Sequence, residues 1–201
     1  DKYKKPKDGV NAWANHLKSF GLGNFMGYDL PTGRKGHIPT SKFYERFYPN
    51  GGWRSSTIIS NSIGQGEVSM TPIQLANMMA TIANRGYYYT PHIVKKIKGQ
   101  PLDKKFTTKN IATIDPNYFP PIIQGLADVY NFGTASSLKV KDLQICGKTG
   151  TAENKIRVAG KTYQLQDHSI FVAFAPKDNP TIAVAVVVEH GHWGNSWAGP
   201  I

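Results

Sequence analysis

Cysteine is almost absent from this sequence. The only cysteine among 201 residues is Cys146, so no disulfide can form within the chain. A zinc site needs several thiol or imidazole ligands at short spacing, and His190 and His192 are accompanied by neither a second cysteine nor an H-x-x-x-H pattern. We therefore expect no metal and no cofactor, and we interpret Cys146 as a buried strand residue.

Long hydrophobic runs are also missing. The longest purely apolar run covers residues 182–188, well below the roughly 20 residues that a membrane helix needs. No signal-peptide pattern opens the sequence. Because 40% of the residues are hydrophobic, the composition predicts a globular chain with one sizeable core. A tethered or periplasmic location stays open if the sequence is a piece of a longer protein.

Acidic residues are scarce relative to basic ones. Lysine and arginine number 24 against 13 aspartates and glutamates, giving a formal net charge of +11. Much of the excess lies in residues 1–7, in residues 95–105, and at Lys139 and Lys141. Such a charge attracts polyanions such as nucleic acid or anionic surfaces, but solvated surface lysines explain it equally well.

The stretch CGKTGTAEN, residues 146–154, contains the G-K-T that ends a phosphate-binding loop. In that loop the first glycine would occupy position 142, where this chain has Asp142. The residues that follow lack the apolar period of the helix that the loop requires. The sequence therefore argues against a nucleotide-binding loop.

Helical patterns and a long loop-rich segment occupy the first two thirds of the chain. Trp13, Leu17 and Phe20 have helical spacing and precede two glycines. Residues 24–60 are rich in glycine and proline, and a connection of that length is usually functional or a covering element. A second helix starts at Thr71 with a proline next and Gln74 completing a capping box. Its expected buried face consists of Ile73, Leu75, Ala76, Met79, Ile82 and Ala83.

A strand is expected at residues 86–99 and a helix at residues 116–132, and strand patterns dominate the rest of the chain. They cover residues 141–149, a polar hairpin limb at 158–165, residues 169–176 and residues 181–189. Short connections between consecutive strands favour antiparallel pairing. Because the last strand is apolar on both faces, we expect it to be central and covered by helices on both sides.

Several stretches together resemble the transpeptidase domain of penicillin-binding proteins, specifically the elongation-type class B group called penicillin-binding protein 2. The matching stretches are FGLG (20–23), GYDLP (27–31), SIGQGEVSMTPIQLANMMATIANRG (62–86), GTA (133–135), CGKTGTAEN (146–154) and HSIFVAFAP (168–176). A lone K-T-G would be weak evidence, but its order and distance after GQG-x-x-x-x-TPIQ are specific.

The resemblance implies an α/β (α+β) fold like that of serine β-lactamases, with an antiparallel sheet flanked by helices. It implies a peptidoglycan D,D-transpeptidase with an acyl-serine mechanism that needs no cofactor and acts on the periplasmic side of the inner membrane. The implied partners are peptidoglycan stem peptides, β-lactams and membrane proteins of the elongation machinery, and not nucleic acid.

The resemblance also assigns roles to residues of the K-T-G strand. Lys148 would supply charge for a substrate carboxylate and for proton transfer, and Gly150 would allow close approach of the substrate. The hydroxyls of Thr149 and Thr151 would bind the carboxylate, and the Thr151 amide would form half of an oxyanion hole, a donor typically worth roughly 3 kcal/mol. Gly64, Gln65 and Gly66 would be structural residues of the active site.

Two family motifs are missing. Neither the S-x-x-K with the nucleophile nor the S-x-N precedes Gln65. The literal S-x-x-K at residues 136–139 lies too close to the next strand for the expected helix, and residues 48–50 imitate Y-x-N in what we interpret as a turn. We therefore expect residues 1–201 to be the C-terminal part of one transpeptidase domain, truncated at both ends. Alone it should be inactive, with exposed core surface that favours self-association.

Two alternatives from other classes remain. A basic nucleic-acid-binding module would explain the charge and the three tyrosines at 87–89, although these lack the stacking motif of an RNA-binding sheet. A catalytically silent relative used as a scaffold would keep the core and lose the site. The intact residues 148–151 favour an enzyme over that alternative.

Overall fold

The chain folds into two units that interleave along the sequence. The computed structural model describes residues 2–201. One unit consists of the residues up to Gln74 together with Tyr87–Ile114, and the other consists of Leu75–Gly86 and Asp115–Ile201. Helix α3 (Pro72–Ala83) begins in the first unit and continues into the second.

The first unit opens with helix α1 (Pro6–Ser19), which has a proline in its first turn and buries Val10 and Ala14. Proline is tolerated at this position because the first amides of a helix have no intrahelical acceptor. The chain then leaves the helix through Gly21, which has a φ of 83° that favours glycine. The helix predicted around Trp13 is confirmed, and it starts earlier than the apolar spacing indicated.

The segment 24–60 contains more regular structure than its composition predicted. Helix α2 spans Ser41–Phe47, and the 3₁₀ helix η1 spans Ser55–Ile63. Helix α2 buries Tyr44, whose ring stacks on Trp53 with centroids 5.3 Å apart. Glycine and proline flank these helices, which explains why the composition of the whole segment hid them.

The start of α3 has the predicted capping box. The Thr71 amide donates to Gln74 Oε1 at 3.0 Å, and the Gln74 amide donates to Thr71 Oγ1 at 3.4 Å. The predicted buried face is correct for Leu75, Met79 and Ala83 but wrong for Ile73, which is 40% exposed. Ile73 lies in the first turn of the helix. The polar side chains of Gln74, Asn77 and Thr81 are buried instead.

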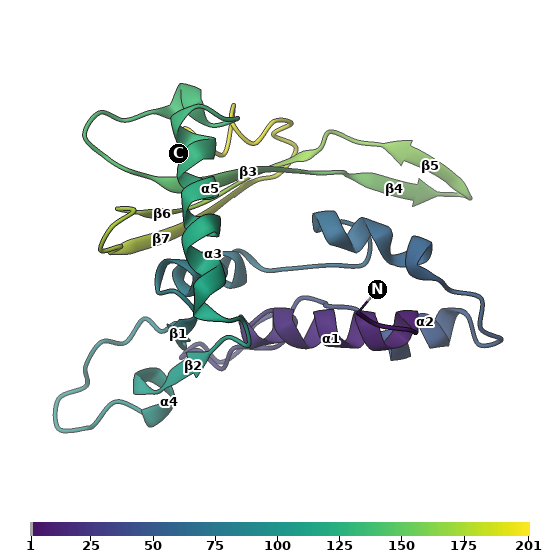
Figure 1. Ribbon diagram of the computed structural model, residues 1–201, viewed down its shortest axis with the longest axis horizontal. Coiled ribbons are helices and arrows are strands. Elements are labelled where there is room, and N and C mark those ends of the chain that lie inside the picture. Colours follow the sequence, from purple (N-terminus) through teal and green to yellow (C-terminus); the bar gives the residue numbers. More distant parts are fainter. Residues whose placement is uncertain (1) are drawn as a thin grey trace. The chain divides into compact units, whose positions relative to one another are not determined.

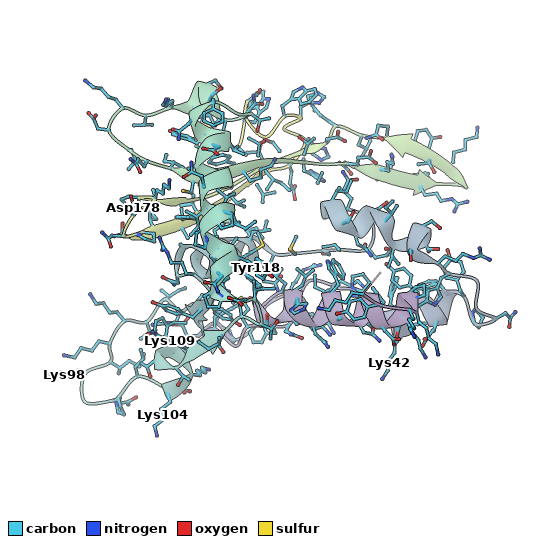
Figure 2. All side chains as sticks on the ribbon, viewed as in Figure 1. Lys42, Lys98, Lys104, Lys109, Tyr118 and Asp178 are labelled. Atoms are coloured by element: carbon cyan, nitrogen blue, oxygen red, sulfur yellow. The ribbon has the colours of Figure 1, made fainter. Side chains whose placement is uncertain are left out.

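Strand β1 (Tyr87–Tyr89) pairs antiparallel with β2 (Lys109–Ile111). The chain between them includes the short helix α4 (Lys104–Thr107) and carries much of the basic charge. Figure 2 shows Lys98 and Lys104 pointing outward from this part of the ribbon. Both lysines are exposed, which is compatible with either reading of the charge.

The second unit pairs a helix with an antiparallel sheet (Figure 1). After the 3₁₀ turn η2 (Pro116–Tyr118), helix α5 (Phe119–Asn131) packs against β3 and is followed by the 3₁₀ turn η3 (Ser136–Leu138). One face of α5 is apolar and buried through Phe119, Ile123, Ala127 and Tyr130. The helix predicted at residues 116–132 is confirmed.

The sheet has the strand order β3–β6–β7, formed by Cys146–Ala152, His168–Ala175 and Ile182–Val188. Both pairings are antiparallel, as predicted. Strands β4 (Lys155–Val158) and β5 (Lys161–Gln164) form a separate exposed hairpin.

The prediction that the last strand is central is wrong within residues 2–201. Strand β6 lies in the middle, and β7 has one neighbour there. The side chains of β7 are accordingly less buried: Ile182 is 59% exposed, whereas Phe174 of β6 is 1% exposed. An apolar pattern indicates that both faces of a strand are covered. It does not indicate which strands pair with its edges. Within the described part of the chain no helix is long and apolar enough to cross a membrane.

Candidate active site

The residues predicted to bind substrate lie on the outer strand of the sheet. Lys148, Thr149, Gly150 and Thr151 are consecutive in β3 and pair in unbroken register with residues 169–172 of β6. Because the register is uninterrupted, successive side chains alternate between the two faces of the sheet. Within residues 2–201, β3 pairs only with β6. Its other edge therefore presents backbone groups that can pair with an extended peptide.

The start of β3 anchors the strand in the core. Cys146 is fully buried, and burial raises the pKa of its thiol to about 11. Gly147 is needed beside it because an added Cβ would lie 2.8 Å from the ring of Phe171. The interpretation of Cys146 as a buried strand residue is therefore confirmed, and the strand becomes accessible from Lys148 onward.

The Lys148 side chain is exposed, and its Nζ donates to the carbonyl of Thr149 at 2.8 Å. In the part of the chain that the structure describes, no carboxylate lies within ion-pairing distance of this ammonium group. An ammonium group has three donors. Two donors thus remain for another acceptor, which suits an anionic ligand.

The two threonines of the strand differ in their surroundings. Thr151 is exposed, whereas Thr149 is half-buried and its hydroxyl lies 2.9 Å from the hydroxyl of Thr134. Thr134 belongs to the G-T-A stretch that follows α5. The sequence marked this stretch as a family match but gave it no role, because no local pattern links residues 134 and 149.

The backbone at Gly150 is closely approached by another segment of the second unit. The segment after β7 crosses the sheet here, and a Cβ on Gly194 would lie 2.6 Å from the carbonyl oxygens of Gly150 and Ile170. The buried Ser169 holds this segment in place: its hydroxyl donates to the Trp193 carbonyl at 2.9 Å and accepts from the Ala198 amide at 3.0 Å. The close approach requires glycine at position 194, whereas a Cβ on Gly150 would meet the side chain of Ile170 at 3.3 Å.

Gly64, Gln65 and Gly66 form a turn in the first unit, whereas residues 148–151 belong to the second. Gly64 (φ 75°) and Gly66 (φ 70°) both have left-handed backbone conformations. The Gln65 amide donates to the Ser60 carbonyl at 3.1 Å, and a Cβ on Gly66 would lie 2.9 Å from Asn61 Oδ1. Both glycines are therefore required by the geometry of the turn.

The stretches that imitate family motifs, residues 136–139 and residues 48–50, have the local structure that was predicted for them. Ser136 begins the three-residue turn η3, so no long helix starts there. Residues 48–50 form a turn closed by a 3.0 Å bond from the Gly51 amide to the Tyr48 carbonyl. Neither serves as the start of a buried catalytic helix.

Comparison with known proteins identifies the protein family of the chain. Residues 6–201 match the family model described as the penicillin-binding protein transpeptidase domain. The chain therefore belongs to the penicillin-binding protein transpeptidase family, and the predicted fold class is confirmed.

Named relatives include peptidoglycan D,D-transpeptidase MrdA of Acinetobacter baumannii, which is 35% identical over 204 residues, covering 95% of this chain. The chain spans 29% of that relative's length. Penicillin-binding protein 2 of Pseudomonas aeruginosa, solved in complex with WCK 5153, has a TM-score of 0.75 at 32% identity, covering 96% of this chain and 42% of the other. The corresponding protein of Helicobacter pylori, solved in complex with MreC, has a TM-score of 0.73 at 25% identity, covering 96% and 36%.

Proposed function

We propose that this chain is the C-terminal part of a single transpeptidase domain in a peptidoglycan D,D-transpeptidase. We call the chain, together with the N-terminal residues that we propose precede it, the parent protein. The observation that carries the proposal is the exposed outer strand β3, which combines a lysine ammonium with two donors to spare, two threonine hydroxyls and, within residues 2–201, an unpaired backbone edge. The family relationship supports the same activity.

In this proposal, a serine of the parent protein attacks the carbonyl between the last two D-alanines of a stem peptide. The terminal D-alanine leaves, and the amine of a second strand then takes the acyl group from the serine. Lys148, Thr149 and Thr151 bind the terminal carboxylate, because an ammonium and two hydroxyls supply the donors that a carboxylate needs. The Thr151 amide donates to the oxyanion, and the turn at Gly64, Gln65 and Gly66 supports the site.

The setting of the parent protein follows from the same reasoning. Its substrates are peptidoglycan stem peptides, and β-lactams bind as mimics of their D-alanyl ends. We place it at the inner membrane facing the periplasm, held by a helix outside this chain. Its partners are then membrane proteins of the elongation machinery, in line with the complex of the H. pylori relative with MreC. The isolated chain is inactive because it lacks the nucleophile.

Intact mass after incubation with benzylpenicillin tests this proposal. The parent protein should gain the mass of the drug as an acyl-serine, and the isolated 201-residue chain should not. Labelling of the isolated chain would identify a nucleophile within it, and Ser136 would be the first residue to mutate. If neither protein is labelled, the transpeptidase assignment fails and a catalytically silent scaffold becomes the better reading.

A further inference from the structure

The turn after α5 places one hydroxyl against the candidate carboxylate-binding strand. Thr134 Oγ1 lies 2.9 Å from Thr149 Oγ1, although the two residues are 15 positions apart. We propose that Thr134 is a positioning residue, whose hydroxyl donates to Thr149 and thereby leaves the Thr149 proton free for a ligand carboxylate. This inference rests on the proposed function, since it concerns the same site.

The backbone on both sides of Thr134 is fixed. The Gly133 amide donates to the Asp128 carbonyl at 3.0 Å, and the Ala135 amide donates to the Val129 carbonyl at 3.1 Å. Ala135 is fully buried in the core of the second unit. Gly133 has no room for a side chain, because a Cβ there would lie 2.7 Å from the Val129 Cα. Thr134 thus lies between two neighbours that are held by hydrogen bonds and packing, which lowers the entropic cost of bringing its hydroxyl to β3.

The donor count of the hydroxyl pair determines what it offers a ligand. Each hydroxyl has one proton and two lone pairs, and a carboxylate can only accept. When Thr134 donates to Thr149, the Thr134 proton lies between the two hydroxyl oxygens. The Thr149 proton then points away from Thr134 and is available to another acceptor. A hydroxyl that accepts a bond is also polarised into a better donor. A carboxylate beside β3 therefore favours the direction in which Thr134 donates to Thr149, because the Thr149 hydroxyl can then donate to the carboxylate.

The remaining polar groups of the strand strengthen this reading. Lys148 Nζ contacts the carbonyl of Thr149 and not its hydroxyl, so the ammonium does not compete for that oxygen. Thr151 has no comparable partner among the described residues and is exposed. Of the two strand hydroxyls, only that of Thr149 has its direction set by a neighbouring side chain.

The test uses the parent protein and the second-order rate constant for its acylation. Benzylpenicillin is compared with its methyl ester, which lacks the charged carboxylate. Thr134→Val should lower the rate constant for benzylpenicillin about 3- to 10-fold, the usual effect of losing one hydrogen bond, and leave that for the ester unchanged. Thr134→Ser should stay within about twofold of wild type, because it retains the hydroxyl. In a Thr149→Val background, Thr134→Val should have no further effect.

Ser137→Ala is the matched control, since it removes an exposed hydroxyl from the same segment and should leave both rate constants unchanged. An equal loss for acid and ester in Thr134→Val would assign Thr134 to general support of the fold and overturn the inference. Unchanged rates in Thr134→Val would overturn it as well. If wild-type parent protein is not acylated at all, the proposed function fails first, and that result is distinguishable from either of these.

Discussion

The hydroxyl of Tyr44 donates to the carboxylate of Glu67 across 2.7 Å, although the two residues are 23 positions apart. Tyr44 lies on α2, and Glu67 directly follows the turn formed by Gly64, Gln65 and Gly66. The side-chain amide of Asn61 lies 2.6 Å from the same hydroxyl. Helix α2 therefore holds the turn in place through one buried phenol.

Replacement of this phenol should destabilise the first unit. Tyr44 is 1% exposed, so Tyr44→Phe removes a buried hydroxyl that contacts the Glu67 carboxylate and the Asn61 amide. We expect a loss of about 1–3 kcal/mol in the free energy of unfolding, measured by urea denaturation of the parent protein. Tyr48→Phe is the control, because Tyr48 is 43% exposed and its change should fall within about 0.5 kcal/mol. Equal midpoints for the two variants would contradict the role of Tyr44.

The same residue predicts a pH dependence at alkaline pH. Burial, followed by the hydrogen bond to Glu67, raises the pKa of Tyr44 to about 12. The folded state thus favours the neutral phenol, and this stabilisation is complete below the unfolded pKa of about 10 and is lost as pH rises toward about 12. The advantage of wild type over Tyr44→Phe should shrink by about 2–3 kcal/mol over that interval. An advantage that stays constant across that range would show that Tyr44 ionises as it does in the unfolded chain.

Gln74 was predictable as a helix cap but not as a link between distant segments. Its Nε2 donates to the carbonyls of Gly21, Asn24 and Lys35 at 3.3, 3.0 and 2.9 Å. The T-P-I-Q pattern revealed the local bond to Thr71, since a capping box spans four residues. The three carbonyls come from segments 39 to 53 positions away, and a pattern in one sequence window carries no information about them.

Gln74→Glu should therefore be strongly destabilising even though it changes few atoms. The new carboxylate oxygen would face three carbonyl oxygens in a site where Gln74 is 1% exposed. We expect a loss of about 2–4 kcal/mol in the free energy of unfolding at neutral pH. Gln144→Glu makes the same chemical change at an exposed position and should have little effect. Similar denaturation midpoints for the two variants would show that the buried amide contributes no more than a surface one.

The candidate site shows the same division between local and distant information. The buried start of β3 and the accessible residues 148–151 followed from a strand pattern and a motif within one stretch of sequence. The edge position of β7 within residues 2–201, the helix α2 within a loop-rich segment and the contact of Thr134 with Thr149 did not. Each depends on which segments pack together, and a hydrophobic pattern gives the face to be covered without naming its neighbour.

Two glycines provide a paired test of packing near the site. Gly194→Ala places a Cβ 2.6 Å from two carbonyl oxygens, so the segment must move and we expect a loss of about 1–3 kcal/mol in stability. Gly125→Ala, within α5, meets nothing within 4 Å and should stabilise the protein by about 0.5–1 kcal/mol. Thermal unfolding of both variants measures the two effects. A stabilising Gly194→Ala would show that the segment after β7 does not lie against β3 as described.

The charge of Lys148 can be separated from any effect on folding. Its side chain is exposed and, among residues 2–201, bonds only the neighbouring Thr149 carbonyl, so Lys148→Met should leave the unfolding midpoint of the parent protein unchanged. Loss of a charge-assisted bond to the carboxylate should lower the second-order rate constant for acylation by benzylpenicillin at least about 10-fold. Lys161→Met, on the exposed hairpin strand β5, removes the same charge elsewhere and is the control. Equal effects of the two variants would mean that the general positive charge of the chain attracts the drug, and Lys148 would then have no specific place in the site.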